Sequence, residues 1–349
     1  MHKPNASWYP TNVATFTLPK LTSNVRHQRT TTREAGAQAP LVAPGPTHRM
    51  ARHVVDHDTI HIDAIVSEIE HSHIRLGFVA DVHHGPNEYG KHGERALELL
   101  EAAVHGLDRV NCDAVVDLGD RITDTSPEAD LMRTEEVASR WRTLRRPRHH
   151  LVGNHDRSVP RDAAERSLET DLGSHVASYG DLRLVVWNAT VAYPGLRLAD
   201  DDLDWLAQTL AASDAPTVIV SHVPVGGGSL VGNAYFEHAA EGRGRYQDEA
   251  AARESIVQHP HVLACVAGHV HWNAVHVVDG VVFLTLHGLT ERFTTPPHAS
   301  GAWATLDVGP TTLRWEVRGG DPFLLELPRR RPGQRWIRRA RRDPWPDDA

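Results

Sequence analysis

Apolar and polar positions follow two different periods along most of this chain. Short apolar runs rich in Val, Leu and Ile predict buried strands over residues 75–81, 113–120, 149–156, 182–190, 216–222 and 262–271. Between the first three runs, apolar residues along one helical face over 91–107 predict an amphipathic helix, and the start and end signals of 126–146 predict another helix. Strands separated by helices are typical of βαβ units, so we predict a largely parallel sheet covered by helices.

Two of the predicted helices have recognisable starts. Ser126 suits an N-cap and Pro127 suits the first helical position, and acids follow them. Three acids, Asp200 to Asp202, begin another helix between two predicted strands. These signals support the alternation of helices and strands.

The second half of the chain predicts antiparallel strands as well. The stretch 274–286 reads as a hairpin around the turn pair Asp279-Gly280, and 302–308 and 312–318 read as a further antiparallel pair. We therefore expect an α/β fold in which two mixed sheets pack face to face and helices cover the outside.

The ends of the chain differ from this pattern. Residues 1–53 show no period and contain one acid, Glu34, so we predict a disordered N-terminal extension, with Met50 as a second candidate for the natural start. The folded domain is expected over 60–320. An Arg-rich C-terminal tail follows at 328–349; it has eight arginines between positions 329 and 342, and we assign it no role.

Composition indicates the cellular compartment of the protein and the classes of partner that it lacks. The chain has 349 residues and a formal net charge of −8, so it has no general attraction to nucleic acid. No apolar run approaches the roughly 18 residues of a membrane span, and no signal-peptide core follows the N-terminus. Cys112 and Cys265 lie in apolar runs, as reduced and buried thiols do. We expect a cytoplasmic protein without a membrane or nucleic-acid partner.

Five predicted strands end in side chains that can bind metal ions. These ends are Asp81-Val82-His83, Gly119-Asp120, Gly153-Asn154-His155-Asp156, Ser221-His222 and Gly268-His269-Val270-His271. Ligands of parallel sheets bind beyond the carboxyl ends of the strands. In an extended segment, residues i and i+2 project to one side, so Asp81 and His83 should hold one ion together. The series therefore predicts a common site at one end of the sheets.

This series, over roughly residues 75–275, resembles the calcineurin-like metallophosphoesterase superfamily. The resemblance implies a four-layer αββα sandwich with a two-metal centre. By motif position, it assigns the first metal to Asp81, His83, Asp120 and His271, and the second metal to Asp120, Asn154, His222 and His269. It also implies that the catalytic residue His155 protonates the leaving oxygen of the substrate.

The implied activity is hydrolysis of a phosphate ester by a metal-activated hydroxide. Two divalent ions, the carboxylates of Asp81 and Asp120 and a bridging hydroxide together leave about one positive charge at the site. Such a centre attracts phosphate even on an acidic protein. The N and O ligands suit two divalent or mixed-valence ions, with Mn, Fe, Zn and Ni all left open.

Four residues near the implied ligands have roles that the sequence leaves open between two alternatives. Many family members have Asp or Asn three residues after the bridging Asp, but the sequence GDRITD places Thr123 there and Asp124 one residue later. The carboxylate partner of His155 is therefore either Asp124 or Asp156. His84 and Arg121 either contact the phosphate or support the ligands.

The substrate class is left open between two esters. The run G-N-H-D followed by Arg157 is similar to small bacterial phosphodiesterases, which favours a phosphodiester of the cyclic-nucleotide or glycerophosphodiester type. The alternatives are a phosphomonoesterase and a catalytically weak metal-binding interaction module. An amidohydrolase would need a catalytic carboxylate or a carbamylated lysine, and no lysine occurs after Lys91. We expect a phosphorylated small molecule as the partner, in an oligomeric state that the sequence leaves open.

Overall fold

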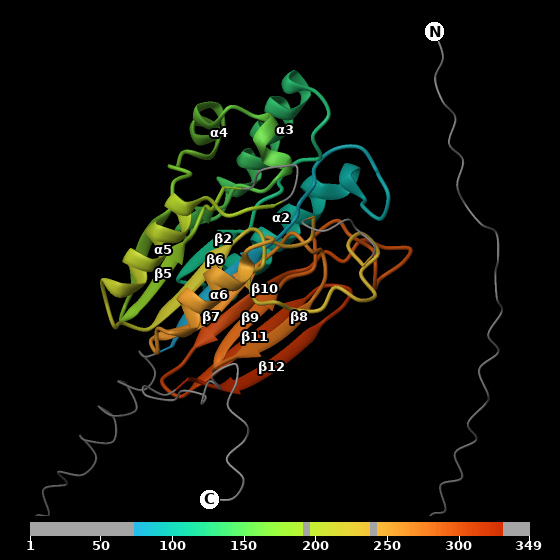
Figure 1. Cartoon of the computed structure of the whole chain (residues 1–349). Coiled ribbons are helices and arrows are strands. Elements are labelled where there is room, and N and C mark those ends of the chain that lie inside the picture. The colour runs from blue at the N-terminus through green and yellow to red at the C-terminus, as the bar shows by residue number, and fades with distance from the viewer. Residues whose placement is uncertain (1–72, 191–195, 238–242, 331–349) are drawn as a thin grey trace, which may run out of the picture. The chain divides into compact units, whose positions relative to one another are not determined.

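The computed structural model describes residues 73–190, 196–237 and 243–330, which form two six-stranded sheets (Figure 1). The predicted extension 1–53 and residues 331–349 of the predicted Arg-rich tail lie outside the described residues, as do positions 60–72 of the predicted domain. Among the described residues, no helix is long and apolar enough to cross a membrane.

The first sheet combines a parallel and an antiparallel half, in the order β12-β11-β10-β1-β2-β3. Strands β1, β2 and β3 run parallel, whereas β10, β11 and β12 pair antiparallel. The bounds are β1 (Ile74–Val79), β2 (Ala114–Asp117), β3 (Arg148–His150), β10 (Trp303–Val308), β11 (Thr312–Arg318) and β12 (Phe323–Pro328).

The second sheet has the order β4-β5-β6-β7-β9-β8. Its four central strands are parallel and its two edge strands are antiparallel. The bounds are β4 (His175–Tyr179), β5 (Leu182–Val186), β6 (Thr217–Ser221), β7 (Val262–Ala267), β8 (Ala274–Val278) and β9 (Val281–Thr285). Asp279 and Gly280, both with positive φ, form the predicted turn between β8 and β9.

Helices cover the outer face of each sheet. The helical segments are η1 (Gly93–Arg95), α2 (Ala96–Arg109), α3 (Pro127–Trp141), η2 (His155–Ser158), α4 (Arg161–Leu168), α5 (Asp200–Ala211) and α6 (Glu249–Val257). Apolar residues of α2, α3 and α4 pack on β1 and β2, and those of α5 and α6 pack on β5, β6, β7 and β9. The predicted α/β sandwich of four layers is confirmed.

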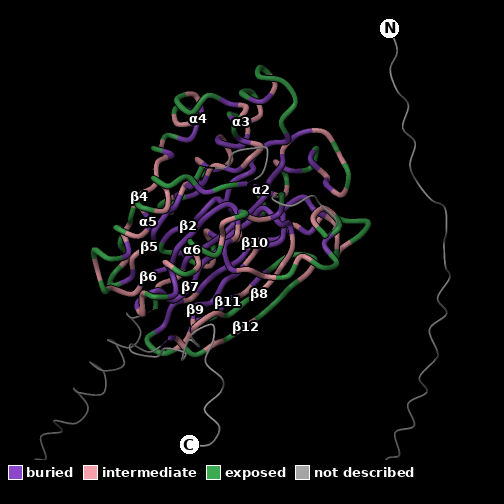
Figure 2. The backbone as a smooth tube through the Cα atoms, viewed as in Figure 1, coloured by how far each residue is buried: buried purple, intermediate pink, exposed green. Residues whose placement is uncertain are grey.

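A continuous apolar core lies between the two sheets. Leu76 and Phe78 of β1 belong to the same buried cluster as Val218 and Val220 of β6. Alternate residues of these strands, such as Val79 and Ile219, face the helices instead, so the strands are buried on both sides. Figure 2 shows this burial along β2, β6 and β7. A rigid sandwich of this kind fixes where the loops after the strands begin.

Five elements were not found from the sequence. They are β4, β12, α4, α6 and η2, and η2 covers the last two positions of the strand predicted over 149–156, where β3 already ends at His150. Strand β12 lies at a sheet edge with mostly exposed or half-buried side chains, so it lacks the apolar run of a buried strand. After it, Arg330 is buried and donates hydrogen bonds to the carbonyl oxygens of Val257 (2.8 Å) and His259 (2.9 Å) at the end of α6.

Candidate metal centre

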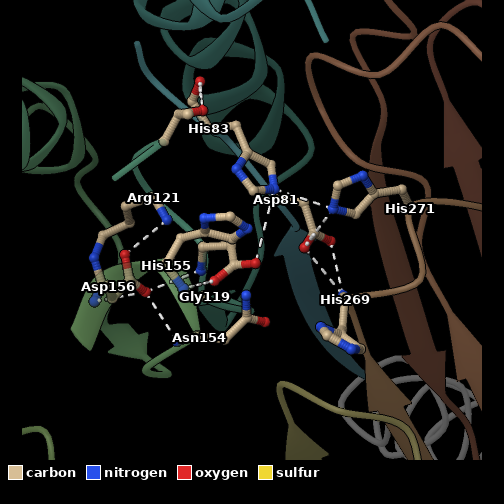
Figure 3. A network of polar contacts seen from close by, with 12 residues as sticks. Asp81, His83, Gly119, Arg121, Asn154, His155, Asp156, His269 and His271 are labelled. Carbon is tan, nitrogen blue, oxygen red and sulfur yellow. Dashed lines mark hydrogen bonds and ion pairs between the residues drawn. The ribbon is translucent and has the colours of Figure 1, made fainter. Parts of the chain in front are cut away.

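The five polar strand ends meet in space at the carboxyl ends of β1, β2, β3, β6 and β7 (Figure 3). Strands β1, β2 and β3 are neighbours in the first sheet, and β6 and β7 are neighbours in the second. Each strand ends one to five residues before the side chains that follow it, and both sheets contribute to the centre. The site therefore lies at one end of the sandwich and bridges the two sheets.

The first group consists of two carboxylates and two imidazoles. Ligand atoms of Asp81, His83, Asp120 and His271 all lie within 4.8 Å of one another, and all four residues are buried. The Nε2 atoms of His83 and His271 are 3.0 Å apart (Figure 3). His271 Nε2 lies 3.4 Å from Asp81 Oδ1, and His83 Nε2 lies 3.7 Å from Asp120 Oδ2. Their electron-pair donors therefore converge on one small volume.

The second group shares Asp120 with the first. Ligand atoms of Asp120, His222 and His269 also lie within 4.8 Å of one another. His222 Nε2 is 3.4 Å from Asp120 Oδ2 and 3.3 Å from Asn154 Oδ1. The structure thus adds the Asn154 amide oxygen to the side of this group.

The backbone at five of the expected ligand positions is not extended. The expectation that extended segments project these side chains to one side was therefore wrong. The angle φ is 51° at Asp81, 45° at His83, 55° at Asp120, 68° at His269 and 58° at His271. Left-handed backbone is uncommon for non-glycine residues and clusters at functional sites. The D-x-H and H-x-H pairs point to one centre because tight left-handed turns follow the strands, rather than because the strands continue.

Two glycines allow the carboxylates to approach the backbone. A β-carbon at Gly153 would lie 2.1 Å from Asp120 Oδ1, and one at Gly268 would lie 2.7 Å from Asp81 Oδ2. Both distances are far below normal contact, so these positions need glycine.

Hydrogen bonds to the outer ring nitrogens orient three of the imidazoles. His222 Nδ1 lies 2.8 Å from the Leu118 carbonyl oxygen, and His269 Nε2 lies 2.8 Å from the Arg243 carbonyl oxygen. His271 Nδ1 lies 3.3 Å from Glu291 Oε2. A donor N–H on the outer nitrogen leaves the inner nitrogen unprotonated, which is the usual arrangement of metal-binding histidines.

Charges within the centre displace several pKa values. Burial lowers the pKa of His222, but the Asp120 carboxylate more than offsets this and raises it to about 9. Burial and the nearby His222 lower the pKa of His269 to about 4. Burial opposes ionisation of Asp120, yet the surrounding imidazoles hold its pKa well below the usual value. The Asp120 carboxylate is therefore ionised and ready to act as a ligand.

His155 lies beside these groups with its ring half exposed to solvent. Its Nδ1 is hydrogen-bonded to Asp124, and its ring centroid is 4.8 Å from that of His83. Its backbone N–H donates to Asp120 Oδ1 at 2.8 Å. Of the two carboxylates considered from the sequence, Asp124 is the one in contact with the His155 ring.

Asp156 has a different set of contacts. It accepts hydrogen bonds from the backbone N–H groups of Asp120, Arg121 and Gly153, each at 2.9 Å, and pairs with the Arg121 guanidinium at 3.0 Å. Arg121 is fully buried and also pairs with Asp117 at 2.9 Å. This ion network ties the loop after β2 to the loop after β3, and Arg121 does not reach an open surface.

The remaining candidate, His84, turns toward α3. Its Nε2 lies 2.7 Å from Glu136 Oε2. This contact holds the His84 ring against the helix.

Sequence reasoning missed Glu291 and Tyr235, which support the first group. Glu291 is completely buried, and besides His271 it accepts hydrogen bonds from the Tyr235 hydroxyl at 3.0 Å and the Arg292 N–H at 2.8 Å. The Tyr235 ring lies edge-on to His271 at 5.4 Å. Both residues lie in long loops without apolar strand patterns, so no local sequence signal marks them.

The donor set fits two closely spaced divalent cations. The described residues place imidazole nitrogens, carboxylate oxygens and one amide oxygen around two adjoining volumes. Such mixed N and O ligands suit Mn, Fe, Zn or Ni. Asp120 contributes to both volumes, so the His and Asp groups are positioned for a dinuclear metal site.

Comparison with known proteins gives a consistent result. A family model described as calcineurin-like phosphoesterase matches residues 74–273, more than half of the chain. A dimetal phosphatase from Danio rerio superposes with a TM-score of 0.60 and 21% identity, covering 73% of this chain and 98% of that chain. A purple acid phosphatase from yellow lupin (Lupinus luteus) seeds superposes with a TM-score of 0.48 and 14% identity, covering 73% of this chain and 53% of that chain. No curated protein sequence matches.

The family match and the geometry of the centre agree with each other. The matched range contains every residue of the two potential metal-binding groups. The likeness to the Danio rerio protein shows the same fold. The chain belongs to the calcineurin-like phosphoesterase family and is a metallophosphoesterase, a hydrolase that acts on phosphate ester bonds.

Proposed function

We propose that the chain hydrolyses phosphodiesters at a dinuclear metal centre. The first ion would be held by Asp81, His83, Asp120 and His271, and the second by Asp120, Asn154, His222 and His269. The observation that carries this assignment is the position of Asp120, whose Oδ2 lies within 3.7 Å of His83 Nε2 and 3.4 Å of His222 Nε2. One carboxylate shared by two nitrogen-rich groups suits a bridge between two cations. When bound, the ions would neutralise phosphoryl charge and lower the pKa of a water molecule at the site.

His155 would donate the proton that the leaving oxygen takes up. Its Nδ1 is occupied by Asp124, so Nε2 is the nitrogen left to exchange a proton with the substrate. The Asp124 carboxylate would also orient the imidazole. Because the His155 side chain is 30% exposed, a substrate can reach it from solvent.

Two features support the choice of substrate. The centre is lined by polar residues at the end of the sandwich, which suits the phosphoryl group of a small phosphorylated molecule. The run Gly153 to Arg157 is similar to that of small bacterial phosphodiesterases, which favours a diester such as a cyclic nucleotide or a glycerophosphodiester. A phosphomonoester is the alternative substrate for the same residues.

Metal analysis followed by turnover tests the proposal. We expect two metal ions per chain and a higher kcat/KM for bis(p-nitrophenyl) phosphate than for p-nitrophenyl phosphate. Asp120→Asn and Asn154→Ala should lose both metal and activity. A protein that holds two ions but hydrolyses neither ester would refute the proposal, and faster turnover of the monoester would refute the preference for diesters.

A further inference from the structure

A cavity of about 440 Å³ lies on the face of the second sheet that α5 and α6 cover. Cys265 and Phe283, which belong to the apolar cluster under these helices, line it. In the described part of the chain, no residue of the two potential metal-binding groups lines this cavity. It is therefore a separate site, and its size is that of a pocket for a small organic molecule.

One wall of the cavity is a loop with three glycines in a row. Gly226, Gly227 and Gly228 follow β6 and line the cavity. A β-carbon at Gly226 would lie 2.6 Å from the Phe283 β-carbon, so the loop packs directly on the sheet at that point. At Gly228, by contrast, a β-carbon would meet no heavy atom of the described residues within 4 Å. The loop is thus anchored at one glycine and leaves open space at another.

The polar groups along the walls are mostly bound to the protein itself. The hydroxyls of Ser221 and Thr285 donate hydrogen bonds to backbone carbonyl oxygens at 3.0 and 2.9 Å. Both polar atoms of the Asn273 amide are engaged with backbone groups, and the Arg245 guanidinium pairs with Glu249 at 3.4 Å. A charged or strongly polar ligand would lose its hydration here and find few free partners. The cavity therefore suits a neutral, apolar molecule.

Aliphatic and aromatic side chains supply much of the remaining lining. They include Val225, Leu230, Val270, Trp272 and Phe283. Contacts with the rings of Trp272 and Phe283 would add to the stabilisation that an aromatic ligand gains from apolar burial. The occupant that fits best is thus a neutral aromatic molecule.

Part of the cavity wall belongs to the loop that carries two expected ligands of the metal centre. Val270 and Trp272 line the cavity, and they alternate along the chain with His269 and His271. Val270 is buried, and its carbonyl oxygen accepts a hydrogen bond from Asn233 Nδ2 at 2.8 Å. Contacts between an occupant and Val270 would therefore restrict the backbone that joins the two histidines.

We propose that this cavity binds a neutral aromatic molecule, and that the occupant strengthens metal binding by ordering the loop of His269 and His271. Two ligands that order the same loop bind cooperatively, because the first one meets part of the entropy cost of the second. The coupling is reciprocal, so bound metal strengthens binding in the cavity by the same factor. The inference goes beyond the proposed function and does not depend on it.

Titration of the full chain with N-phenyl-1-naphthylamine, a neutral dye whose fluorescence rises in apolar surroundings, tests the site. We expect saturable binding of one dye molecule per chain. Ala274→Trp adds a ring to the lining from β8, so it should raise the dye Kd about 10-fold or more. Met132→Trp is the matched control, because it adds the same ring at a 57% exposed position of α3, which packs on the first sheet.

The outcomes test the site and its coupling separately. Absence of saturable binding, or equal dye Kd values in Ala274→Trp and the parent, would overturn the site. If Ala274→Trp lowers the thermal midpoint, His276→Trp, at an exposed position of the same strand, is measured in its place and decides the question. Chelation of the metal should raise the dye Kd of the parent about 5-fold or more, as is typical of coupled sites. A dye Kd that chelation leaves unchanged would refute the coupling to the metal centre.

Discussion

Glu291 shows how a buried residue outside the motifs can control a ligand. Its carboxylate contacts His271 Nδ1 at 3.3 Å, and contacts with Tyr235 and Arg292 hold it in place. Burial opposes its ionisation, but the His271 hydrogen bond keeps the pKa of Glu291 below its usual value. The carboxylate is thus available to fix the orientation of His271.

Replacing Glu291 should therefore weaken metal binding. We expect Glu291→Gln to lower metal affinity about 10- to 100-fold, as is typical for outer partners of metal-binding histidines. Competition with a chelating dye measures this affinity. Glu326→Gln on the edge strand β12 is the control. Equal affinities in the two variants would show that Glu291 does not position His271.

The pair His155 and Asp124 should affect turnover without affecting metal content. His155→Asn removes the proposed proton donor, so we expect kcat to fall about 10²- to 10⁴-fold. Asp124→Asn should cost less, because a half-exposed carboxylate orients the imidazole but does not touch the substrate. Steady-state kinetics with metal analysis of each variant checks both statements. A His155→Asn protein with the parent kcat would remove His155 from the mechanism.

Replacing Arg121 should lower the free energy of unfolding. It is fully buried between Asp117 and Asp156, so Arg121→Met leaves two buried carboxylates without their cation. Breaking such a network is expected to lower the free energy of unfolding by about 3–5 kcal/mol. Urea unfolding measures the change, with Arg166→Met as an exposed ion-pair control that should change it by less than about 1 kcal/mol. A small effect at Arg121 would contradict the structural role of the network.

At the scale of the elements, the pattern of the sequence predicts best the strands that are buried on both faces. Strands β1, β2, β6 and β7 were predicted because a short apolar run such as Thr217–Ser221 is typical of a strand that is buried on both faces. Strands β4 and β12 were missed because edge strands carry mixed side chains. The hairpin of β8 and β9 was predicted because the pair Asp279-Gly280 tolerates the two positive φ angles that a tight hairpin turn needs.

The candidate site was predicted for the side chains that follow strands and missed for those that depend on long loops. The clusters at Asp81, Asp120 and Asn154 lie beside strand ends, so the parallel sheet alone brings them together. Tyr235 and Glu291 meet through a hydrogen bond between two long loops, which no local period encodes. The left-handed backbone of the ligands was also missed, because tight turns of non-glycine residues have no strong sequence signature.

Strands β3 and β4 connect the edges of the two sheets through His149. Its Nδ1 lies 2.9 Å from His175 Nε2, and its Nε2 lies 2.7 Å from the Tyr179 hydroxyl. Burial, followed by the charge of His175, lowers the pKa of His149 to about 4. The folded state therefore resists protonation of this residue.

This shift predicts a loss of stability in acid. Below the unfolded-state pKa of about 6.5, His149 binds a proton in the unfolded chain but stays neutral in the folded protein. The free energy of unfolding therefore falls as the pH decreases from about 6.5 to about 4. At pH 5 the loss from His149 amounts to about 2 kcal/mol. Urea unfolding at pH 7.5 and 5.0, with chelator present, should show a smaller loss for His149→Gln than for the parent. The exposed His105→Gln is the control, and equal losses in all three proteins would refute the assignment.

At the scale of the whole molecule, the metal centre joins the two sheets. Asp81, His83 and Asp120 follow strands of the first sheet, whereas His222, His269 and His271 follow strands of the second. An ion held by both sets would act as a cross-link in addition to the apolar core. Binding of ions to the folded state alone also stabilises it by mass action.

Removal of the metal should therefore lower the thermal midpoint. At a free metal concentration about 1,000-fold above Kd, the stabilisation amounts to about 4 kcal/mol per ion. Differential scanning calorimetry before and after chelation measures the shift, and readdition of metal should reverse it. The same chelation should not shift Asp120→Asn, which lacks the shared ligand. Equal midpoints of the parent with and without metal would contradict the cross-link.

The left-handed turns after the strands have a consequence for how the protein can evolve. The side chains of the centre belong to loops, whereas most of the apolar core belongs to the strands that precede those loops. Substitutions in the neighbouring loops can therefore change substrate selectivity while the scaffold keeps its thermal tolerance. A library randomised over positions 86–89 and 224–231, outside both potential metal-binding groups, is the place from which new ester selectivities should arise.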